Sequence, residues 1–409
     1  MSIDKTSQKA PNLRFKGITD DWEQRKFEDV IISIQTGTNL LGAESNHGIP
    51  LIKMGNIQRG FFSFKKIEFL KENEEVEERN MANFGDFLFN TRNTLELVGK
   101  GATWFGKDNK FAFNSNIARF TFEGINTMFF NYLYNTPQMI KQVQARAVGT
   151  TSVAAVYPKD LNSIKLWVPS ESEQEKIGIL FRHLDNTITL HQRKLDQLNQ
   201  LKEALLQQMF PGKGETVPKL RFAGFEGDWE ERKLGDYLKI PNKTKVNVQS
   251  KDELMTLKLN LGGLEAGSNR DTLSLGSTVY YKRKAGQFIY GKQNFFNGSM
   301  AIIPLELDGK ATSGDVPSLD IVGISKEYLF TYVSREIYWK TKEAKASGTG
   351  SKRIHEKNLQ EFEIFVPREK EQQKIGSFFK HLDNTISSHQ RKLDQLKNMK
   401  QVLLQNMFI

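Results

Sequence analysis

The sequence predicts a short polar turn, Asn90–Asn93, after Gly85–Phe89, an apolar run typical of a buried strand. The turn contains Thr91, Arg92 and Asn93. An arginine side chain can donate two parallel hydrogen bonds to guanine, and an asparagine amide can pair in the same way with adenine. The segment therefore has the chemistry to bind planar polar groups such as nucleobases. A solvated turn is the alternative interpretation of each residue taken alone.

Further cations and amides occur soon afterwards and again in the second half of the chain. Lysines bind phosphate oxygens, and amide or aromatic side chains between them can contact bases. The first group is Lys100, Lys107, Lys110, Asn114, Ser115 and Asn116. The second group is Lys282, Arg283, Lys284, Tyr290, Lys292, Gln293 and Asn294. Ordinary solvated surface is again the alternative for single members, so the clusters are the candidate site.

Two hydroxyl-rich loops recur at equivalent places, each after a predicted helix (Met128–Ala147 and Ser325–Ala346). Hydroxyls, free backbone N–H groups and adjacent cations suit phosphate oxygens and groove edges. The first loop supplies Thr150, Thr151 and Ser152, and the second supplies Thr349, Ser351, Lys352 and Arg353. A plain turn after a helix is the alternative, but the recurrence favours a binding role.

Residues for covalent chemistry are not found in these patterns. The chain has no cysteine and no Pro-Pro dipeptide, and it lacks the G-x-x-x-x-G-K-[ST] phosphate loop. His183 and His191 recur as His381 and His389, but a spacing of eight residues does not bring two histidines to one metal ion. We therefore predict no catalytic residue, no metal site and no cofactor bound by this chain.

The chain is one unit written twice. Residues 11–27 and 218–234 share the pattern PxLRFxGxxxDWExRK followed by an apolar residue, and residues 168–210 match 366–408 without a gap at about two-thirds identity. The intervening pieces, 28–167 and 235–365, show little mutual similarity. Repeated frames around divergent inserts indicate one architecture that carries two different surfaces.

Each repeated segment predicts a long helix with an apolar stripe of period near 3.5, typical of a coiled coil. Helices with matching stripes in one chain pair most simply with each other, because the intramolecular partner has a high effective concentration. Homodimerisation is the less favoured alternative. The predicted pairing residues are Leu184, Ile188, Leu195, Leu198, Leu205, Leu382, Ile386, Leu393, Leu396 and Leu403.

Short strand patterns such as 109–122 accompany the helices of both inserts. We therefore predict an α+β fold in which two pseudo-symmetric mixed α/β domains are separated by an antiparallel coiled coil. The expected segments are a first domain (1–167, with the repeat motif 11–27), a first long helix (168–210), a linker with the second motif (211–234), a second domain (235–365) and a second long helix (366–409).

Composition is consistent with a polyanion as partner. The formal net charge is +10, and a positive protein gains affinity for nucleic acid by releasing condensed counterions. The charge alone does not distinguish this from an ordinary basic protein. No signal peptide and no membrane span are recognisable, so we expect a cytoplasmic protein with no membrane partner.

The repeated motifs resemble those of the specificity subunit of type I restriction–modification enzymes. The resemblance rests on the W-E-x-R-K openings at Trp22 and Trp229, the two variable domains, and the E-Q-x-K-I-G and H-L-D-x-T-I patterns of both long segments. It covers nearly the whole chain.

The resemblance implies a non-catalytic subunit that reads a bipartite site in double-stranded DNA, one half-site per variable domain. It implies partners: two methyltransferase (modification) subunits, joined by motor–nuclease (restriction) subunits. S-adenosylmethionine, ATP and magnesium would belong to those partners. A stand-alone DNA-binding regulator, or a coiled-coil scaffold without enzyme partners, is the alternative.

Overall fold

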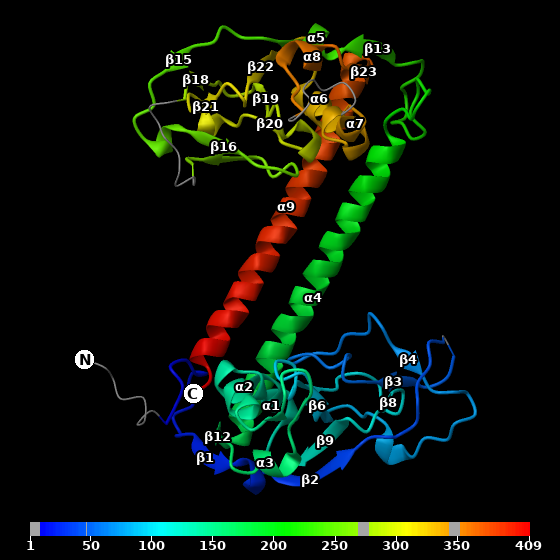
Figure 1. Cartoon of the computed structure of the whole chain (residues 1–409), viewed down its shortest axis with the longest axis vertical. Coiled ribbons are helices and arrows are strands. Elements are labelled where there is room, and N and C mark those ends of the chain that lie inside the picture. The colour runs from blue at the N-terminus through cyan, green and yellow to red at the C-terminus, as the bar shows by residue number, and fades with distance from the viewer. Residues whose placement is uncertain (1–8, 46, 269–277, 343–351) are drawn as a thin grey trace. The chain divides into compact units, whose positions relative to one another are not determined.

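The computed structural model describes residues 9–45, 47–268, 278–342 and 352–409. They form two compact units, Met1–Gln192 with Arg391–Ile409, and Arg193–Gln390 (Figure 1). The boundary falls within both long helices, α4 (Glu171–Gln208) and α9 (Glu369–Asn406). Each unit therefore contains a part of both helices, in addition to one of the predicted domains.

The first unit is built on a four-stranded antiparallel sheet in the order β2-β9-β5-β7. Its strands are β2 (Ile31–Thr36), β5 (Phe87–Asn90), β7 (Gly101–Thr103) and β9 (Ile117–Phe122). Helices α1 (Thr127–Tyr134) and α2 (Pro137–Gln144) supply buried residues to the same core. Phe87 lies at the centre of this core, with its ring 4.8 Å from that of Phe130 and 5.0 Å from that of Tyr134.

Smaller sheets flank this core. They have the orders β4-β3-β8, β10-β11-β6 and β1-β12. Their strands are β1 (Glu23–Lys26), β3 (Pro50–Ile52), β4 (Glu68–Phe69), β6 (Arg92–Asn93), β8 (Ala112–Phe113), β10 (Val148–Gly149), β11 (Ala154–Ala155) and β12 (Lys165–Val168). A short helix, α3 (Pro158–Leu161), precedes β12.

The second unit repeats the same sheet topology with a different sequence. Its four-stranded sheet has the order β14-β22-β19-β20, in which β19 and β20 correspond to β5 and β7. The sheet strands are β14 (Leu238–Lys239), β19 (Phe288–Tyr290), β20 (Met300–Ile302) and β22 (Ser318–Ile321). The pseudo-symmetry expected from the frames thus extends into the divergent inserts.

The second unit contains further strands and helices, some of which have counterparts in the first. The strands are β13 (Glu230–Lys233), β15 (Lys245–Val246), β16 (Met255–Leu257), β17 (Leu264–Ala266), β18 (Tyr280–Lys282), β21 (Ala311–Ser313) and β23 (Glu363–Val366). The helices are α5 (Leu234–Tyr237), α6 (Lys326–Val333), α7 (Glu336–Lys340) and α8 (Glu356–Gln360). As β1 pairs with β12, so β13 pairs with β23.

The long helices run antiparallel within each unit. In the first unit, Lys400 Nζ lies 2.5 Å from Asp185 Oδ1, and the rings of Phe181 and Phe408 are 5.8 Å apart. The later residues of α9 therefore contact the earlier residues of α4. The second unit has the equivalent ion pair, in which Lys202 Nζ lies 2.6 Å from Asp383 Oδ1. The predicted intramolecular pairing is confirmed in both units.

Every predicted pairing residue lies on a buried or half-buried face. In the first unit, Leu184 and Leu396 belong to one apolar cluster, against which Ile188 and Leu403 pack. In the second, Leu198 and Leu382 share a cluster with Leu205 and Ile386 beside it. Leu195 and Leu393 are buried as well. The period of 3.5 thus identified the apolar face correctly.

The E-Q-x-K-I-G pattern at the start of each long helix joins the frame to the domain. Glu173 accepts hydrogen bonds from Arg14 at 2.9 and 2.6 Å, and Gln174 accepts one from the backbone N–H of Asn126, the N-cap of α1. The second unit has the same contacts, in which Glu371 accepts from Arg221 at 2.7 and 2.8 Å and Gln372 accepts from the backbone N–H of Ser325, the N-cap of α6. The motif therefore fixes the start of each long helix to the preceding repeat motif and to a helix of the variable domain.

Four local predictions were wrong in detail. The helix expected over 325–346 is two helices as far as the structure describes it, since Ser334 and Arg335 separate α6 from α7. The single helix expected over 128–147 is two helices, because Pro137 begins α2 after the N-cap Thr136. The strand expected over 109–122 is interrupted, since 114–116 separate β8 from β9. The turn expected at Asn90–Asn93 contains a short strand, β6, which tertiary pairing creates.

Candidate nucleic-acid interface

In the first unit the structure brings two separately predicted clusters together. Strand β6, which contains Arg92 and Asn93, pairs antiparallel with β11, and β11 pairs with β10. The turn between β10 and β11 contains Thr150, Thr151 and Ser152, all exposed. We call this surface, residues 91–93 with 150–152, the first candidate surface.

Backbone hydrogen bonds fix the first candidate surface. The N–H of Val156 donates to the carbonyl oxygen of Thr91 at 2.9 Å, and the N–H of Leu95 donates to that of Thr151 at 3.1 Å. The side chain of Arg92 is exposed, whereas the Asn93 side chain accepts the N–H of Thr94. Arg92 is therefore the member best placed to reach a ligand.

The predicted residues 114–116 lie beside this surface. Thr91 donates both its N–H and its hydroxyl to the carbonyl oxygen of Asn116. The Asn114 side chain accepts the N–H of Asn116 at 3.2 Å, and Ser115 is half-buried. These residues hold the position of Thr91, and their own polar atoms are partly used inside the protein.

Lys100 borders the surface together with a cation that the sequence did not reveal, Arg59. Lys100 Nζ donates to Gln58 Oε1 at 2.8 Å, and Arg59 donates to the carbonyl oxygen of Glu96 at 3.3 Å. Burial, and then the positive charge of Arg59, lower the pKa of Lys100, and burial lowers the pKa of Arg59. The Gly60 that follows Arg59 marks a turn, and this signal could have identified the residue.

Lys107 and Lys110 are not part of this surface. Lys100 precedes β7, whereas these two lysines follow it. The end of β7 that they follow lies opposite Phe87, at the start of β5, and Arg92 follows the other end of β5. Both lysines are exposed. Their closeness to Lys100 in the sequence therefore does not place them beside Arg92.

The second unit joins its predicted clusters in the equivalent way. The N–H of Ile354 donates to the carbonyl oxygen of Lys292 at 3.0 Å, matching the bond between Val156 and Thr91. Gln293 and Asn294 follow Lys292 and are exposed, as Arg92 is after Thr91. Residues 292–294 with Lys352 and Arg353 form the second candidate surface. Thr349 and Ser351 lie outside the described residues.

Some predicted cations of the second surface are already paired with acids. Lys292 Nζ lies 3.1 Å from Glu356 Oε2, and Lys243 Nζ lies 3.0 Å from Oε1 of the same carboxylate. Burial opposes ionisation of Glu356, but hydrogen bonds from its backbone N–H and from both lysines lower its pKa to about 2. The stabilisation of the fold by the ionised Glu356 carboxylate is therefore complete above the ordinary glutamate pKa, and it is lost as the pH falls toward 2 and the carboxylate is protonated. Arg353 pairs with Asp315 at 3.1 Å.

Two residues of the predicted second group are part of the core. Tyr290 is 0% exposed and donates its hydroxyl to the carbonyl oxygen of Ile354, so a DNA base cannot reach its ring. Arg283 is 3% exposed and binds Thr312 together with two backbone carbonyls. Burial lowers the pKa of Arg283 to about 10. The sequence could not separate these structural polar groups from surface ones.

Lys282 and Lys284 belong to the β18–β19 connection. Lys282 is exposed at the end of β18, and Lys284 is also exposed, with its backbone N–H donating to Gln287 Oε1 at 3.0 Å. Within the described ranges, no group of acidic and histidine side chains could hold a metal ion. None of the helices described is both long and apolar enough to span a bilayer.

Comparison with known proteins agrees with this architecture. The sequence model of the type I restriction modification DNA specificity domain matches twice, at residues 19–200 and 226–398. The putative type I restriction enzyme MjaX specificity subunit of Methanocaldococcus jannaschii is 23% identical over 415 residues, which cover 95% of this chain and 92% of that protein. The MjaVIII specificity subunit of the same organism is 24% identical over 202 residues, 48% of this chain and 47% of that protein.

A solved structure shares the fold. The S subunit of a type I restriction–modification system from M. genitalium aligns with a TM-score of 0.64 over 98% of this chain and 99% of that one, at 13% identity. The double match of the family model covers most of the sequence and repeats in the two halves that the structure relates by pseudo-symmetry. The chain belongs to the type I restriction–modification DNA specificity family.

Proposed function

We propose that each unit reads one half of a bipartite site in double-stranded DNA, the first through residues 91–93 and 150–152 and the second through residues 292–294 and 352–353. The family is the non-catalytic, DNA-recognising component of type I restriction–modification systems. The observation that carries the proposal is the equivalence of the two surfaces. In both, a strand-end segment and a loop from more than 60 residues later are joined by the same hydrogen bond, Val156 to Thr91 and Ile354 to Lys292.

We further propose that the long helices bind two methyltransferase subunits, through which motor–nuclease subunits join. S-adenosylmethionine, ATP and magnesium would be bound by these partners and not by this chain. Exposed apolar residues at equivalent positions of the helices support the stoichiometry. Leu201 is 49% exposed and its counterpart Met399 is 50% exposed, one in each unit. Two equivalent apolar positions fit two copies of one partner.

A domain exchange tests the proposed function. Replacing residues 28–167 with the corresponding insert of a relative is expected to change one half-site and leave the other unchanged, because the frame contacts of the second unit are untouched. The methylated sites of cells that carry the exchanged chain, mapped by sequencing, provide the measurement. A change of both half-sites would show that the units share one reading surface, and the proposal would then be wrong.

Single substitutions test the two surfaces. Arg92→Ala is expected to relax the first half-site at one base pair, since a bidentate contact to a base contributes about 1–3 kcal/mol of discrimination. Gln293→Ala should act in the same way on the second half-site alone. Competition binding against DNA duplexes with single base changes measures both effects. Lys107→Ala is the control, because this exposed lysine follows the opposite end of β7; an effect on specificity as large as that of Arg92→Ala would contradict the assignment.

A further inference from the structure

A tight hairpin turn lies beside the first candidate surface. Ile57 and Phe62 form an antiparallel bridge, and the N–H of Gln58 donates to the carbonyl oxygen of Phe61 at 2.9 Å. Gly60 has a φ of +81°, a backbone conformation that glycine adopts without strain. The turn therefore presents Arg59 and Phe61 at its tip.

Buried amides hold this turn in place. Asn56, which is 5% exposed, donates to the carbonyl oxygens of Ser63 at 3.0 Å and Lys66 at 2.7 Å. The N–H of Gly60 donates to the carbonyl oxygen of Gly101 at 3.0 Å, and the carbonyl oxygen of Gly60 accepts from Asn131. The tip is thus fixed to the edge strand β7 and is a preorganised element.

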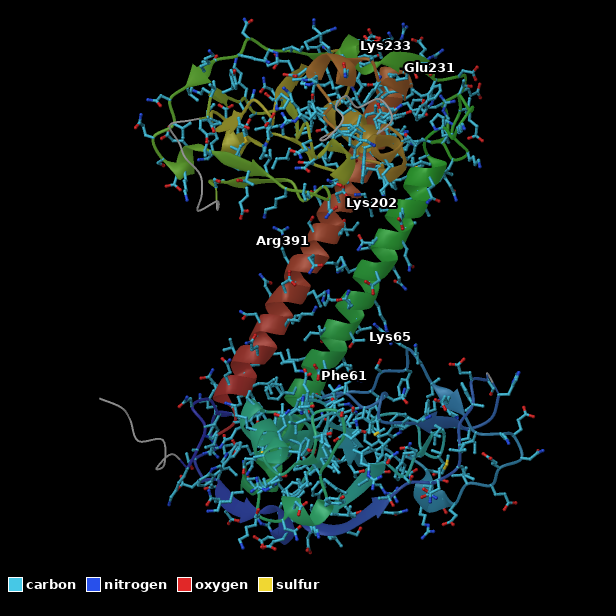
Figure 2. The ribbon with its side chains drawn as sticks, in the orientation of Figure 1. Phe61, Lys65, Lys202, Glu231, Lys233 and Arg391 are labelled. Atoms are coloured by element: carbon cyan, nitrogen blue, oxygen red, sulfur yellow. The ribbon has the colours of Figure 1, made fainter. Side chains whose placement is uncertain are left out.

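Phe61 is the apolar residue that the tip presents to solvent. Phe61, labelled in Figure 2, is 59% exposed, whereas the ring of the next residue, Phe62, packs 5.1 Å from that of Trp104. Lys65 is also exposed in this segment, Lys100 Nζ donates to Gln58 Oε1 of the turn, and Arg59 is close enough to Lys100 to lower its pKa. Glu96 is the acidic residue that influences these two cations. An exposed aromatic ring among cations is complementary to DNA, in which the apolar thymine methyl groups lie in a groove bordered by phosphates.

The second unit has an equivalent tip with a different sequence. Strands β16 and β17 form a hairpin whose turn is closed by the N–H of Gly262 donating to Leu259, and Leu259 is 47% exposed. The N–H groups of Asn260 and Leu261 donate to the carbonyl oxygens of Asn297 and Gly298. The carbonyl groups of Asn297 and Gly298 come just before β20, and that of Gly101, which holds the first tip, is at the start of β7. Because β7 and β20 are the equivalent edge strands, both tips are fixed at the same edge of their sheets.

We propose that Phe61 and Leu259 are specificity-determining residues that make apolar contacts with base edges in the DNA groove, one in each half-site. The inference rests on the proposed function and adds to it a second, apolar reader beside each polar surface. In the major groove the thymine methyl group is the apolar feature that such side chains can distinguish. Each tip is fixed to the same edge of its sheet but has a different sequence, so the two tips provide different apolar side chains, Phe61 after the anchored Gly60 and Leu259 before the anchored Asn260.

The test uses the assembled complex with its methyltransferase subunits and a duplex that contains the site mapped for the wild type. Phe61→Ala is expected to weaken binding by about tenfold or more, the loss that corresponds to leaving an aromatic side chain out of an apolar contact. The loss should disappear when the first half-site is scrambled, since the contact no longer exists in the wild type. Leu259→Ala should show the same pattern with the second half-site.

Matched controls are available in the same units. Ile32 is 62% exposed in the first unit and Leu305 is 81% exposed in the second, and both lie away from the tips in sequence. Ile32→Ala and Leu305→Ala are expected to leave DNA affinity unchanged. Circular dichroism and size-exclusion chromatography verify that all four variants fold and assemble.

Three results would overturn the inference: wild-type affinity of Phe61→Ala, an equal loss on the intact and scrambled sites, or a loss of complex assembly in place of DNA affinity. The last result would show that the tip contacts a protein partner. Failure of the proposed function is a separate observation, because the wild-type complex would then show no preference for any bipartite site.

Discussion

Replacing Glu371 with alanine is expected to destabilise the second unit by about 3–5 kcal/mol, the usual cost of removing one partner from a buried ion pair. Glu371 is 0% exposed and both of its carboxylate oxygens accept from Arg221, at 2.7 and 2.8 Å. The hydrogen bond to this carboxylate is the main cause that raises the pKa of Arg221. Without Glu371, the arginine that fixes the repeat motif to α9 has no counter-charge at this position.

The equivalent glutamate of the first unit, Glu173, has one more hydrogen-bond partner than Glu371. Glu173 accepts from Arg14 in the same way and also from the indole N–H of Trp22 at 3.1 Å. Within the described parts of the chain, the corresponding indole N–H of Trp229 has no hydrogen-bond partner. Glu173→Ala should therefore be more destabilising than Glu371→Ala, because it also leaves Trp22 unsatisfied.

Urea unfolding of the purified chain, followed by far-ultraviolet circular dichroism, measures both variants. Glu361→Ala is the control, since Glu361 pairs at the surface with Lys233, which is labelled in Figure 2, and both side chains are more than half exposed. Surface ion pairs contribute little to stability. If Glu371→Ala unfolds at the same urea concentration as Glu361→Ala, the buried pair does not anchor the motif.

Replacing Gly376 with alanine is expected to destabilise the protein by about 1–3 kcal/mol, the usual cost of overpacking. Helix propensity predicts the opposite sign, because alanine inside a helix is about 1 kcal/mol more favourable than glycine. The close approach of α6 to α9 at Gly376 makes the overpacking cost the larger of the two effects. A Cβ atom at Gly376 would lie 2.7 Å from Tyr328 N and 2.8 Å from Glu327 Cβ, too close for any real contact.

The same substitution at Gly178 should have the same sign, since a Cβ atom there would lie 2.8 Å from Met128 Cβ and 2.9 Å from Phe129 N. Ser387→Ala provides the control for helix propensity alone, because Ser387 is exposed on α9 and should gain a few tenths of a kcal/mol. Calorimetric melting temperatures compare the three variants. A higher melting temperature for Gly376→Ala would mean that α6 does not press against α9 as described.

The frame of this protein could be predicted from the sequence because its signals are local and occur twice. A periodic apolar stripe specifies a helix face wherever it occurs, so Leu184, Leu198 and their repeats were assigned to a buried face without knowledge of the fold. Repeated segments also form equivalent contacts, as the ion pairs of Lys400 with Asp185 and Lys202 with Asp383 show. The repeated order of motifs was sufficient to indicate the family.

The roles of single motif residues needed the structure. Gly178 and Gly376 look like interruptions of a helical stripe, and only the close approach of α1 and α6 explains them. Glu173 and Glu371 suit a helix N-terminus by sequence, but their burial and their arginine partners depend on segments about 150 residues away.

The composition of the two candidate surfaces depended on tertiary structure to a still greater extent. The sequence supplied Arg92, Gln293 and the hydroxyl-rich loop at 150–152, but their assembly depends on strand pairing between distant segments, which leaves no local pattern. For the same reason Tyr290 and Gln293 looked alike in one polar cluster, although one is in the core and the other at the surface. Local periodicity determines which face of an element is apolar; which polar loops meet is determined by long-range backbone hydrogen bonds that form only when the sheet assembles.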